Sequence, residues 1–243
     1  MPQTKGQLET ELLRLSQLHE AIIEQTIAKH LAELGGAMAM DGRLAPWEEL
    51  LSTRPEGHLV SNGRREFGRS VWMASAGQYG VAFASLRLFL ELSFAAVFFS
   101  ANEYRRRVWL ADRWDFSWSQ ALDVESGILS PDFINAFNPL AADDGPKYKQ
   151  LASAVYRSCS QFLHGKQSAL ETAPNEVDYS ESALLSWCKL ATDAQESVHF
   201  LYYSRYGMDL LPSSTKEVEQ TLLDVLAHLS SVQTTLATLG VEK

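Results

Sequence analysis

Cysteine is scarce in this sequence, and nothing at its start resembles an export signal. Only two of the 243 residues are cysteines, Cys159 and Cys188, and their spacing matches neither a disulfide framework nor a zinc motif. The first 15 residues lack the apolar run after a basic start that marks a secretory signal peptide. We therefore expect reduced thiols and a cytoplasmic protein.

Basic charge is also limited. The chain has 21 lysines and arginines against 30 acidic residues, which gives a net charge of -9. Such a field repels nucleic acid unless basic residues gather locally. The sequence contains no glycine-rich phosphate loop, no nucleophile motif and no metal-ligand spacing around its histidines. It therefore predicts neither a metal site nor a cofactor.

Strand patterns and internal repeats are lacking as well. No segment alternates apolar and polar residues above background, whereas 46% of the residues are hydrophobic, enough to form a core. We expect an all-α helical bundle forming a single domain over residues 1–243. Its expected parts are an N-terminal helix in 1–40, a core in 70–206 and a C-terminal helix in 213–243.

The first helix is predicted from apolar residues that recur at spacings near 3.6 over 7–34. Gly35-Gly36 indicates its end, because glycine is the commonest residue just beyond a helix. Residues 41–69 are rich in glycine, proline and arginine. We expect a connector there, with at most a short helix around Trp47 to Leu51.

Further helices are predicted from apolar spacing, caps and breakers. Ser130-Pro131 is an N-cap followed by proline at the first helical position, which favours a short helix ending near Phe137. Residues 138–146 are expected to form a loop. The other predicted helices cover 80–112 and 147–165, followed by one that opens at an Asp178/Glu181 capping arrangement and stops after Tyr206, at Gly207.

The last predicted helix begins at a capping box formed by Ser214 and Glu217. Its apolar residues follow an unbroken 4-3-4-3 spacing: Val218, Leu222, Val225, Leu229, Val232, Leu236 and Leu239. A seam of this period packs along one neighbouring helix. The first helix is the expected partner, and a homodimer seam is the alternative.

One apolar run, residues 81–101, is long enough to span a membrane. Arg87 and Glu91 lie in the middle of it, and a charge at a bilayer centre costs about 2.5 to 3.5 kcal/mol on insertion scales. We therefore expect a central core helix covered by its neighbours, and no membrane partner.

Arg157 and His164 are seven residues apart on one predicted helix. At 100° per residue they lie within about 20° of each other, two turns apart. A polar stripe opposite an apolar one is also what any surface helix shows. The spacing alone therefore permits a site without requiring one.

The surrounding run is Tyr156-Arg-Ser-Cys-Ser-Gln-Phe-Leu-His-Gly-Lys166. It resembles the signature helix of the HEPN superfamily, in which an arginine is followed after four to six residues by a histidine. Arg87 and Glu91 resemble the Arg/Glu helix of uncharacterised bacterial members that carry a Tyr-x3-Ser-x3-His-Gly motif.

The resemblance implies a compact, often dimeric helical bundle and a metal-independent endoribonuclease in a toxin or antiviral-defence system. His164 would transfer the proton, and Arg157 would stabilise charge at the phosphate. Tyr156, Ser160, Arg87 and Glu91 would support that pair. RNA and a protein partner or second copy are the partners that it implies.

Two other functions fit the same sequence. One is a catalytically inactive helical module that binds protein or RNA within a larger complex, and the other is a ligand-binding bundle. Arg105, Arg106 and Arg107 lie among tryptophans, and with Lys166 they are candidate nucleic-acid contacts. The alternative is that the three arginines complement the dipole at a helix end.

Overall fold

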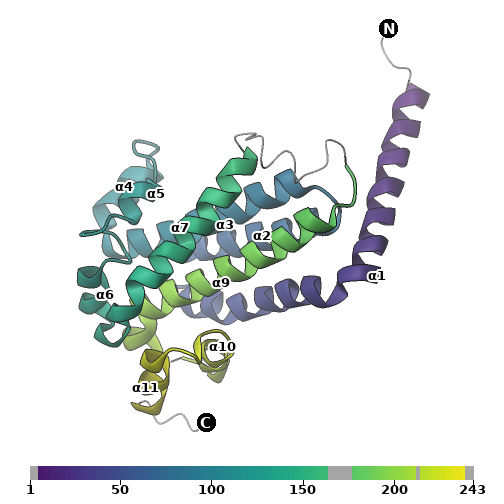
Figure 1. Ribbon diagram of the computed structural model, residues 1–243. Coiled ribbons are helices and arrows are strands. Elements are labelled where there is room, and N and C mark those ends of the chain that lie inside the picture. The colour runs from purple at the N-terminus through teal and green to yellow at the C-terminus, as the bar shows by residue number, and fades with distance from the viewer. Residues whose placement is uncertain (1–4, 164–176, 212–213, 239–243) are drawn as a thin grey trace.

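The computed structural model describes residues 5–163, 177–211 and 214–238. Within these ranges every regular element is a helix, and the helices pack around one hydrophobic core (Figure 1). The prediction of an all-α bundle is confirmed.

The first helix, α1 (Lys5–Leu51), is much longer than predicted. It kinks at His30, whose φ of -136° and ψ of 33° are not helical, and then runs along the base of the core (Figure 1). Beyond the kink its buried residues are Leu34, Ala37, Met40, Leu44, Trp47 and Leu51. The predicted end at Gly35-Gly36 is wrong, because this packing outweighs the low helix propensity of glycine.

The predicted connector over 41–69 is also wrong. Beyond α1 it contains most of a second long helix, α2 (Gly57–Ser75). Gly63 lies where α2 crosses α3 (Tyr79–Ala101), and a Cβ atom there would sit 3.2 Å from Ser93 Oγ. This glycine therefore permits close helix packing instead of ending a helix.

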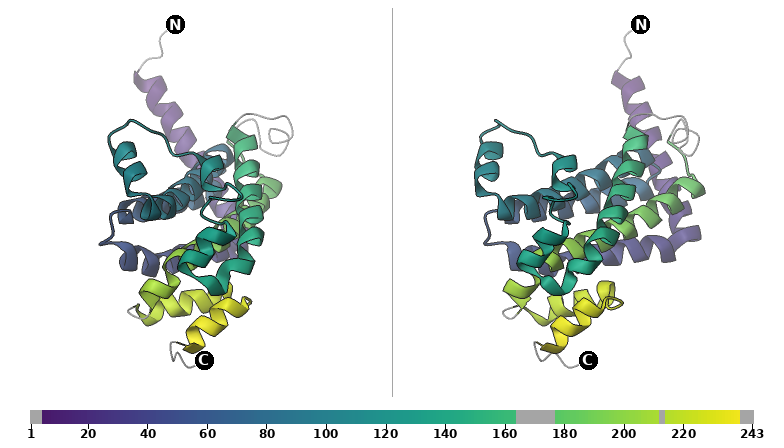
Figure 2. Two further views of the ribbon diagram at one scale, coloured as in Figure 1. Left: turned by 90° about the vertical axis from the view of Figure 1, so that its left-hand side faces the viewer. Right: turned by 60° about the vertical axis from the view of Figure 1, so that its left-hand side comes forward.

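α3 lies at the centre of the molecule, between α2, α7 (Gly145–Leu163) and α9 (Glu181–Leu210) (Figures 1 and 2). Among the described residues it is the one helix long and apolar enough to cross a membrane, but 67% of its most apolar window is buried inside the protein. Burial of this kind is what a core helix shows.

The predicted central helix over 80–112 is two helices. α3 ends at Asn102, whose φ of -132° and ψ of 68° are not helical, and α4 (Glu103–Leu110) follows directly. The break coincides with the change from the apolar run of α3 to the charged residues that open α4.

Short helices connect α4 to α7. The tryptophan-rich stretch contains α5 (Trp118–Ala121). α6 (Pro131–Phe137) confirms the predicted cap, since the Ser130 hydroxyl accepts a hydrogen bond from the Phe133 N–H at 3.2 Å. A 3₁₀ helix, η1 (Pro139–Asp144), occupies most of the predicted loop.

α9 differs from its prediction at both ends. Ser180, not Asp178, is the N-cap, and its hydroxyl accepts from the Ala183 N–H. The helix continues past Gly207 to Leu210, and Gly207 is buried within it. A Cβ atom there would lie 2.8 Å from Tyr203 Cδ2, so this glycine also serves packing.

The C-terminal helix is broken into α10 (Lys216–Leu226) and α11 (Ser230–Thr238). The capping box is wrong as well: Thr215 precedes α10, and the Ser214 hydroxyl donates to the Leu211 carbonyl. Both views of Figure 2 place α10 and α11 at the end of the bundle opposite the chain's N-terminus.

α10 packs against α1, as predicted, but only on the part of α1 beyond the kink. Arg43 Nε lies 3.4 Å from Asp224 Oδ2, and the Thr221 hydroxyl donates to the Arg43 carbonyl at 3.5 Å. The apolar seam is buried at five positions and half-buried at Val225, and Leu239 lies outside the described residues.

Candidate functional site

Arg157 lies on the outer side of α7. The opposite face of this helix is buried through Tyr148, Ala152, Val155 and Cys159, which leaves the Arg157 side chain exposed. His164 and Lys166, the other predicted site residues of this segment, lie outside the described residues. The structure therefore describes one member of the predicted reactive pair.

The neighbouring Tyr156 joins α7 to α3 through a compact polar cluster. Its hydroxyl donates to Glu91 Oε1 at 2.9 Å and accepts from Arg87 Nη2 at 2.6 Å. Arg87 Nη2 also donates to the same Glu91 oxygen at 3.0 Å, and Arg87 Nε lies 3.2 Å from it. Three of the predicted supporting residues thus meet, from two helices.

Aromatic side chains cover this cluster. The Trp118 ring of α5 stacks on the Tyr156 ring, with centroids 4.2 Å apart and planes 8° apart. The Arg87 guanidinium carbon lies 4.6 Å from the Tyr156 centroid. Since stacked rings of this kind restrict side-chain rotation, Trp118 helps to hold Tyr156 in its hydrogen-bonding position.

The surroundings keep the cluster in one protonation state. Burial, together with the hydrogen bond to Glu91 and its negative charge, raises the pKa of Tyr156 above its usual value. Burial acts to lower the pKa of Arg87, but the charge of Glu91, the Tyr156 hydroxyl and the hydrogen bonds to both together outweigh it, and the pKa is raised. At neutral pH the Tyr156 phenol therefore stays neutral and Arg87 stays charged.

Ser160 does not join the cluster. Its hydroxyl donates to the Tyr156 carbonyl one turn earlier on α7, at 2.7 Å. Serine commonly makes this bond inside helices. The Ser160 hydroxyl therefore donates its proton to the helix backbone and does not donate it to an imidazole.

The arginines of α4 are separate from the α7 cluster and partly neutralised. Glu103 accepts from Arg106 Nε at 2.7 Å and from Arg107 Nε at 2.6 Å, and these two hydrogen bonds lower the Glu103 pKa to about 2. Arg105 lies over the Trp114 ring, 5.2 Å from its centroid. The predicted basic patch thus keeps one arginine without a carboxylate partner among the described residues.

No group of three or more histidine, cysteine or acidic residues in the described part of the chain is arranged to hold a metal ion. Cys159 is fully buried in the core, and burial raises the pKa of its thiol to about 12. A thiol in this environment packs as a small apolar group.

The role of Trp118 beside Tyr156 was not predictable from the sequence. Thirty-eight positions separate Trp118 from Tyr156, and no local pattern links a residue of the tryptophan-rich stretch to α7.

Comparisons with family models, with curated proteins and with solved structures found no match for this chain.

Proposed function

We propose that this chain is a HEPN-like protein that acts on RNA as a metal-independent endoribonuclease, with Arg157 and His164 as its reactive pair. The Arg87–Glu91–Tyr156 cluster carries the proposal. It ties one turn of α7 to the central helix α3, and the next residue along that turn presents its guanidinium to solvent. A reactive group needs such a fixed support, because catalysis depends on preorganised geometry.

The reaction would be a transesterification within the RNA backbone. His164 takes the proton from a ribose 2′-OH as its oxygen attacks the adjacent phosphorus, and the bond to the 5′-oxygen breaks. Arg157 stabilises the charge on the phosphorane oxygens through its paired N–H donors. One imidazole does not supply both proton transfers at once, so His164 of a second copy protonates the leaving 5′-oxygen.

Such an enzyme suits a cytoplasmic toxin or antiviral-defence effector. Uncontrolled RNA cleavage harms the cell that makes it, so we propose a protein partner that restrains it. The resemblance of residues 156–166 to the HEPN signature supports this setting.

A second candidate is a catalytically inactive module that binds RNA or protein. Arg157 is exposed on the outer face of α7. It lines neither of two surface hollows, one between α1 and α2 beside Trp72 and the other between α6 and α7 beside Lys149. Two of the three α4 arginines are paired with Glu103. These observations favour surface binding over a closed active site.

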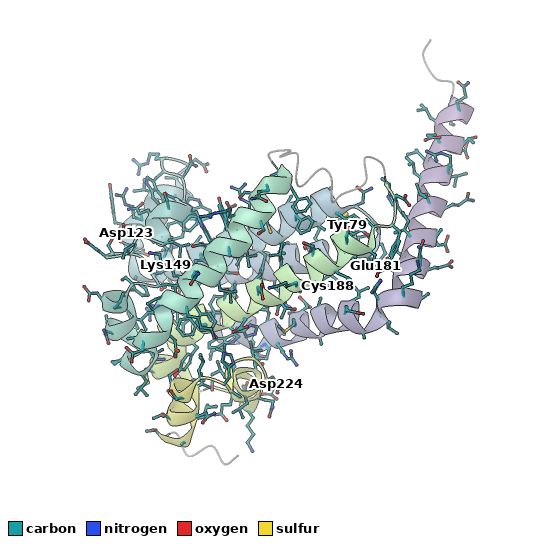
Figure 3. The ribbon with its side chains drawn as sticks, viewed as in Figure 1. Tyr79, Asp123, Lys149, Glu181, Cys188 and Asp224 are labelled. Atoms are coloured by element: carbon teal, nitrogen blue, oxygen red, sulfur yellow. The ribbon has the colours of Figure 1, made fainter. Side chains whose placement is uncertain are left out.

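The test is cleavage of a mixed RNA pool with all metal chelated. We compare the wild type with Arg157→Ala, His164→Ala and a control, Lys149→Ala, which removes a positive charge from the same helix (Figure 3). Loss of the general base should lower the rate about 100-fold or more, whereas the control should cleave like the wild type.

Equal cleavage by His164→Ala would remove that residue as a catalyst. RNA binding without cleavage by the wild type, weakened in Arg157→Ala, would establish the second candidate instead.

A further inference from the structure

The bend of α1 at His30 encloses an ionisable ring. The part of α1 before the bend, residues 5–29, forms an arm whose outer end projects from the helical body (Figures 1 and 2). One turn before the bend, the Thr26 hydroxyl donates to the Ser75 carbonyl at the end of α2. The His30 side chain turns towards the start of α9, and the residue is only 8% exposed. The ring therefore lies where the arm meets two helices of the body.

Neither ring nitrogen of His30 has a hydrogen-bond partner among the described residues. A carboxylate lies near each of them: Glu33 Oε1 of α1 is 3.7 Å from Nδ1, and Glu181 Oε1 of α9 is 3.9 Å from Nε2. These distances are too long for hydrogen bonds. Both glutamate side chains are about half exposed, at 46% and 60%, and have room to move closer. The buried ring therefore lies between two acceptors and bonds to neither.

The number of protons on the ring decides how many of these acceptors His30 satisfies. A neutral imidazole has one N–H donor, and its other nitrogen is an acceptor that offers a carboxylate nothing. The imidazolium has two N–H donors, and here one faces each glutamate. Hydrogen bonds between an imidazolium and a carboxylate are charge-assisted and therefore strong. Only the protonated ring satisfies both of its nitrogens at this position.

The charges around the ring favour its protonated form. The Tyr179 ring lies nearly parallel to the imidazole, with centroids 6.3 Å apart and planes 19° apart. Lys29 Nζ lies over the other aromatic ring, 4.7 Å from the Tyr179 centroid, and Asp178 precedes this tyrosine in the chain. One positive charge therefore stands against the carboxylates of Asp178, Glu33 and Glu181.

The remaining ionisable groups at this contact stay neutral between pH 5 and 8. On α9, burial raises the pKa of the Cys188 thiol to about 11. On α3, burial also raises the pKa of Tyr79 above its usual value. The end of α2, residues 70–75, contains no ionisable side chain. Figure 3 labels Tyr79, Glu181 and Cys188, which lie together where α9 begins. His30 is therefore the group at this contact that gains charge on mild acidification.

We propose that His30 is a proton-operated clamp on the bend of α1. Histidine is the side chain whose charge changes between pH 5 and 8. As the pH falls through this range, the imidazolium draws Glu33 and Glu181 onto its two nitrogens and ties the bend to α9. As the pH rises, one ring proton is lost, one of these contacts opens, and the arm moves more freely about the bend. Mild acidification thus fixes the direction of the arm.

Urea unfolding of the full chain tests the protonation. The wild type and His30→Gln are compared at about pH 8 and about pH 5.5, because comparison at each pH removes the effect of other titrating groups. The wild-type folding equilibrium constant, divided by that of the variant, should rise about three- to tenfold on acidification, as expected for two partly exposed ion pairs.

Two further variants make the test specific. Glu181→Gln removes one carboxylate and leaves the ring in place, so it should lose part of the gain on acidification. This variant decides the question even if His30→Gln does not fold. His58→Gln is the control, because His58 is exposed and has no ion pair with a carboxylate in the described part of the chain. Its ratio to the wild type should be the same at both pH values.

Spin labels measure the arm directly. We place one at Thr10→Cys on the arm and one at Glu49→Cys on α1 beyond the bend, where both positions are exposed. The native cysteines are buried and stay unlabelled. The distribution of distances between the labels should be narrower at about pH 5.5 than at about pH 8. In His30→Gln it should be equally broad at both.

A ratio that is unchanged by acidification would overturn the proposal, and so would a ratio that falls. The second result would mean that burial of the charged ring outweighs the two carboxylates. Distance distributions that do not depend on pH would overturn the action on the arm. The clamp involves α1 and α9 but not α7, so these outcomes are independent of the ribonuclease proposal.

Discussion

At the scale of single residues, the Tyr156 hydroxyl links α7 to α3 in the candidate site. It bonds to both members of the Arg87–Glu91 pair, which is only partly exposed. Arg87 and Glu91 lie four residues apart on one helix, a spacing at which an arginine and a glutamate can pair. This spacing does not predict their bonds to Tyr156, because those bonds depend on how α7 crosses α3.

Tyr156→Phe removes this hydroxyl and leaves the ring stacked on Trp118. We expect the free energy of unfolding to fall by about 1 to 2 kcal/mol, because the hydrogen bonds that are lost involve charged groups. Chemical denaturation measures the change.

Tyr179→Phe is the matched control. The Tyr179 hydroxyl is buried without a hydrogen-bond partner among the described residues, so its removal should not destabilise the protein. An equal loss in both variants would show that the bonds of Tyr156 contribute nothing specific.

At the scale of elements, glycine was the main source of wrong boundaries. Gly35, Gly63 and Gly207 lie inside helices, although glycine usually marks helix ends or loops. At Gly63 and Gly207 the neighbouring atoms explain why the residue is glycine, since a Cβ atom would meet Ser93 at the first position and Tyr203 at the second. Local sequence does not reveal such a contact, because it involves a second helix or a neighbouring turn.

The two central glycines of α2 provide a test of helix packing. Gly63→Leu forces a large side chain between α2 and α3 and should destabilise the protein by at least about 1 to 3 kcal/mol. Thermal and urea unfolding measure the loss.

Gly68→Leu is the control in the same helix. A Cβ atom at Gly68 meets nothing within 4 Å, so this change should stabilise the helix by roughly 0.5 to 1 kcal/mol. Destabilisation by both substitutions would contradict the packing explanation for Gly63.

At the scale of the whole molecule, the C-terminal helices close one end of the bundle. The labelled residues of Figure 3 mark both ends: Asp224 lies at the contact of α10 with α1, and Tyr79 and Glu181 lie where α3 and α9 begin. There the Ser180 N–H donates to the Tyr79 hydroxyl at 3.0 Å. Residues far apart in the sequence therefore secure each end of the core.

Leu222 tests whether α10 belongs to the cooperative core. It is fully buried, and Leu222→Ala should lower the free energy of unfolding by about 2 to 5 kcal/mol. Leu185→Ala on α9, where the leucine is 38% exposed, should cost clearly less. If α10 melts separately from the body, circular dichroism will show two transitions instead of one.

The helical class, the burial of α3, the α6 cap and the contact of the last helices with the first all follow from the amino-acid sequence. These features depend on apolar periodicity and local capping, which involve only residues close together in the sequence. Three features depend on packing in three dimensions: the position of the kink in α1, the helical state of α2, and the contact of Tyr156 with Arg87 and Glu91 beside Trp118. Those outcomes depend on which atoms face one another across helices, and no local pattern records such contacts.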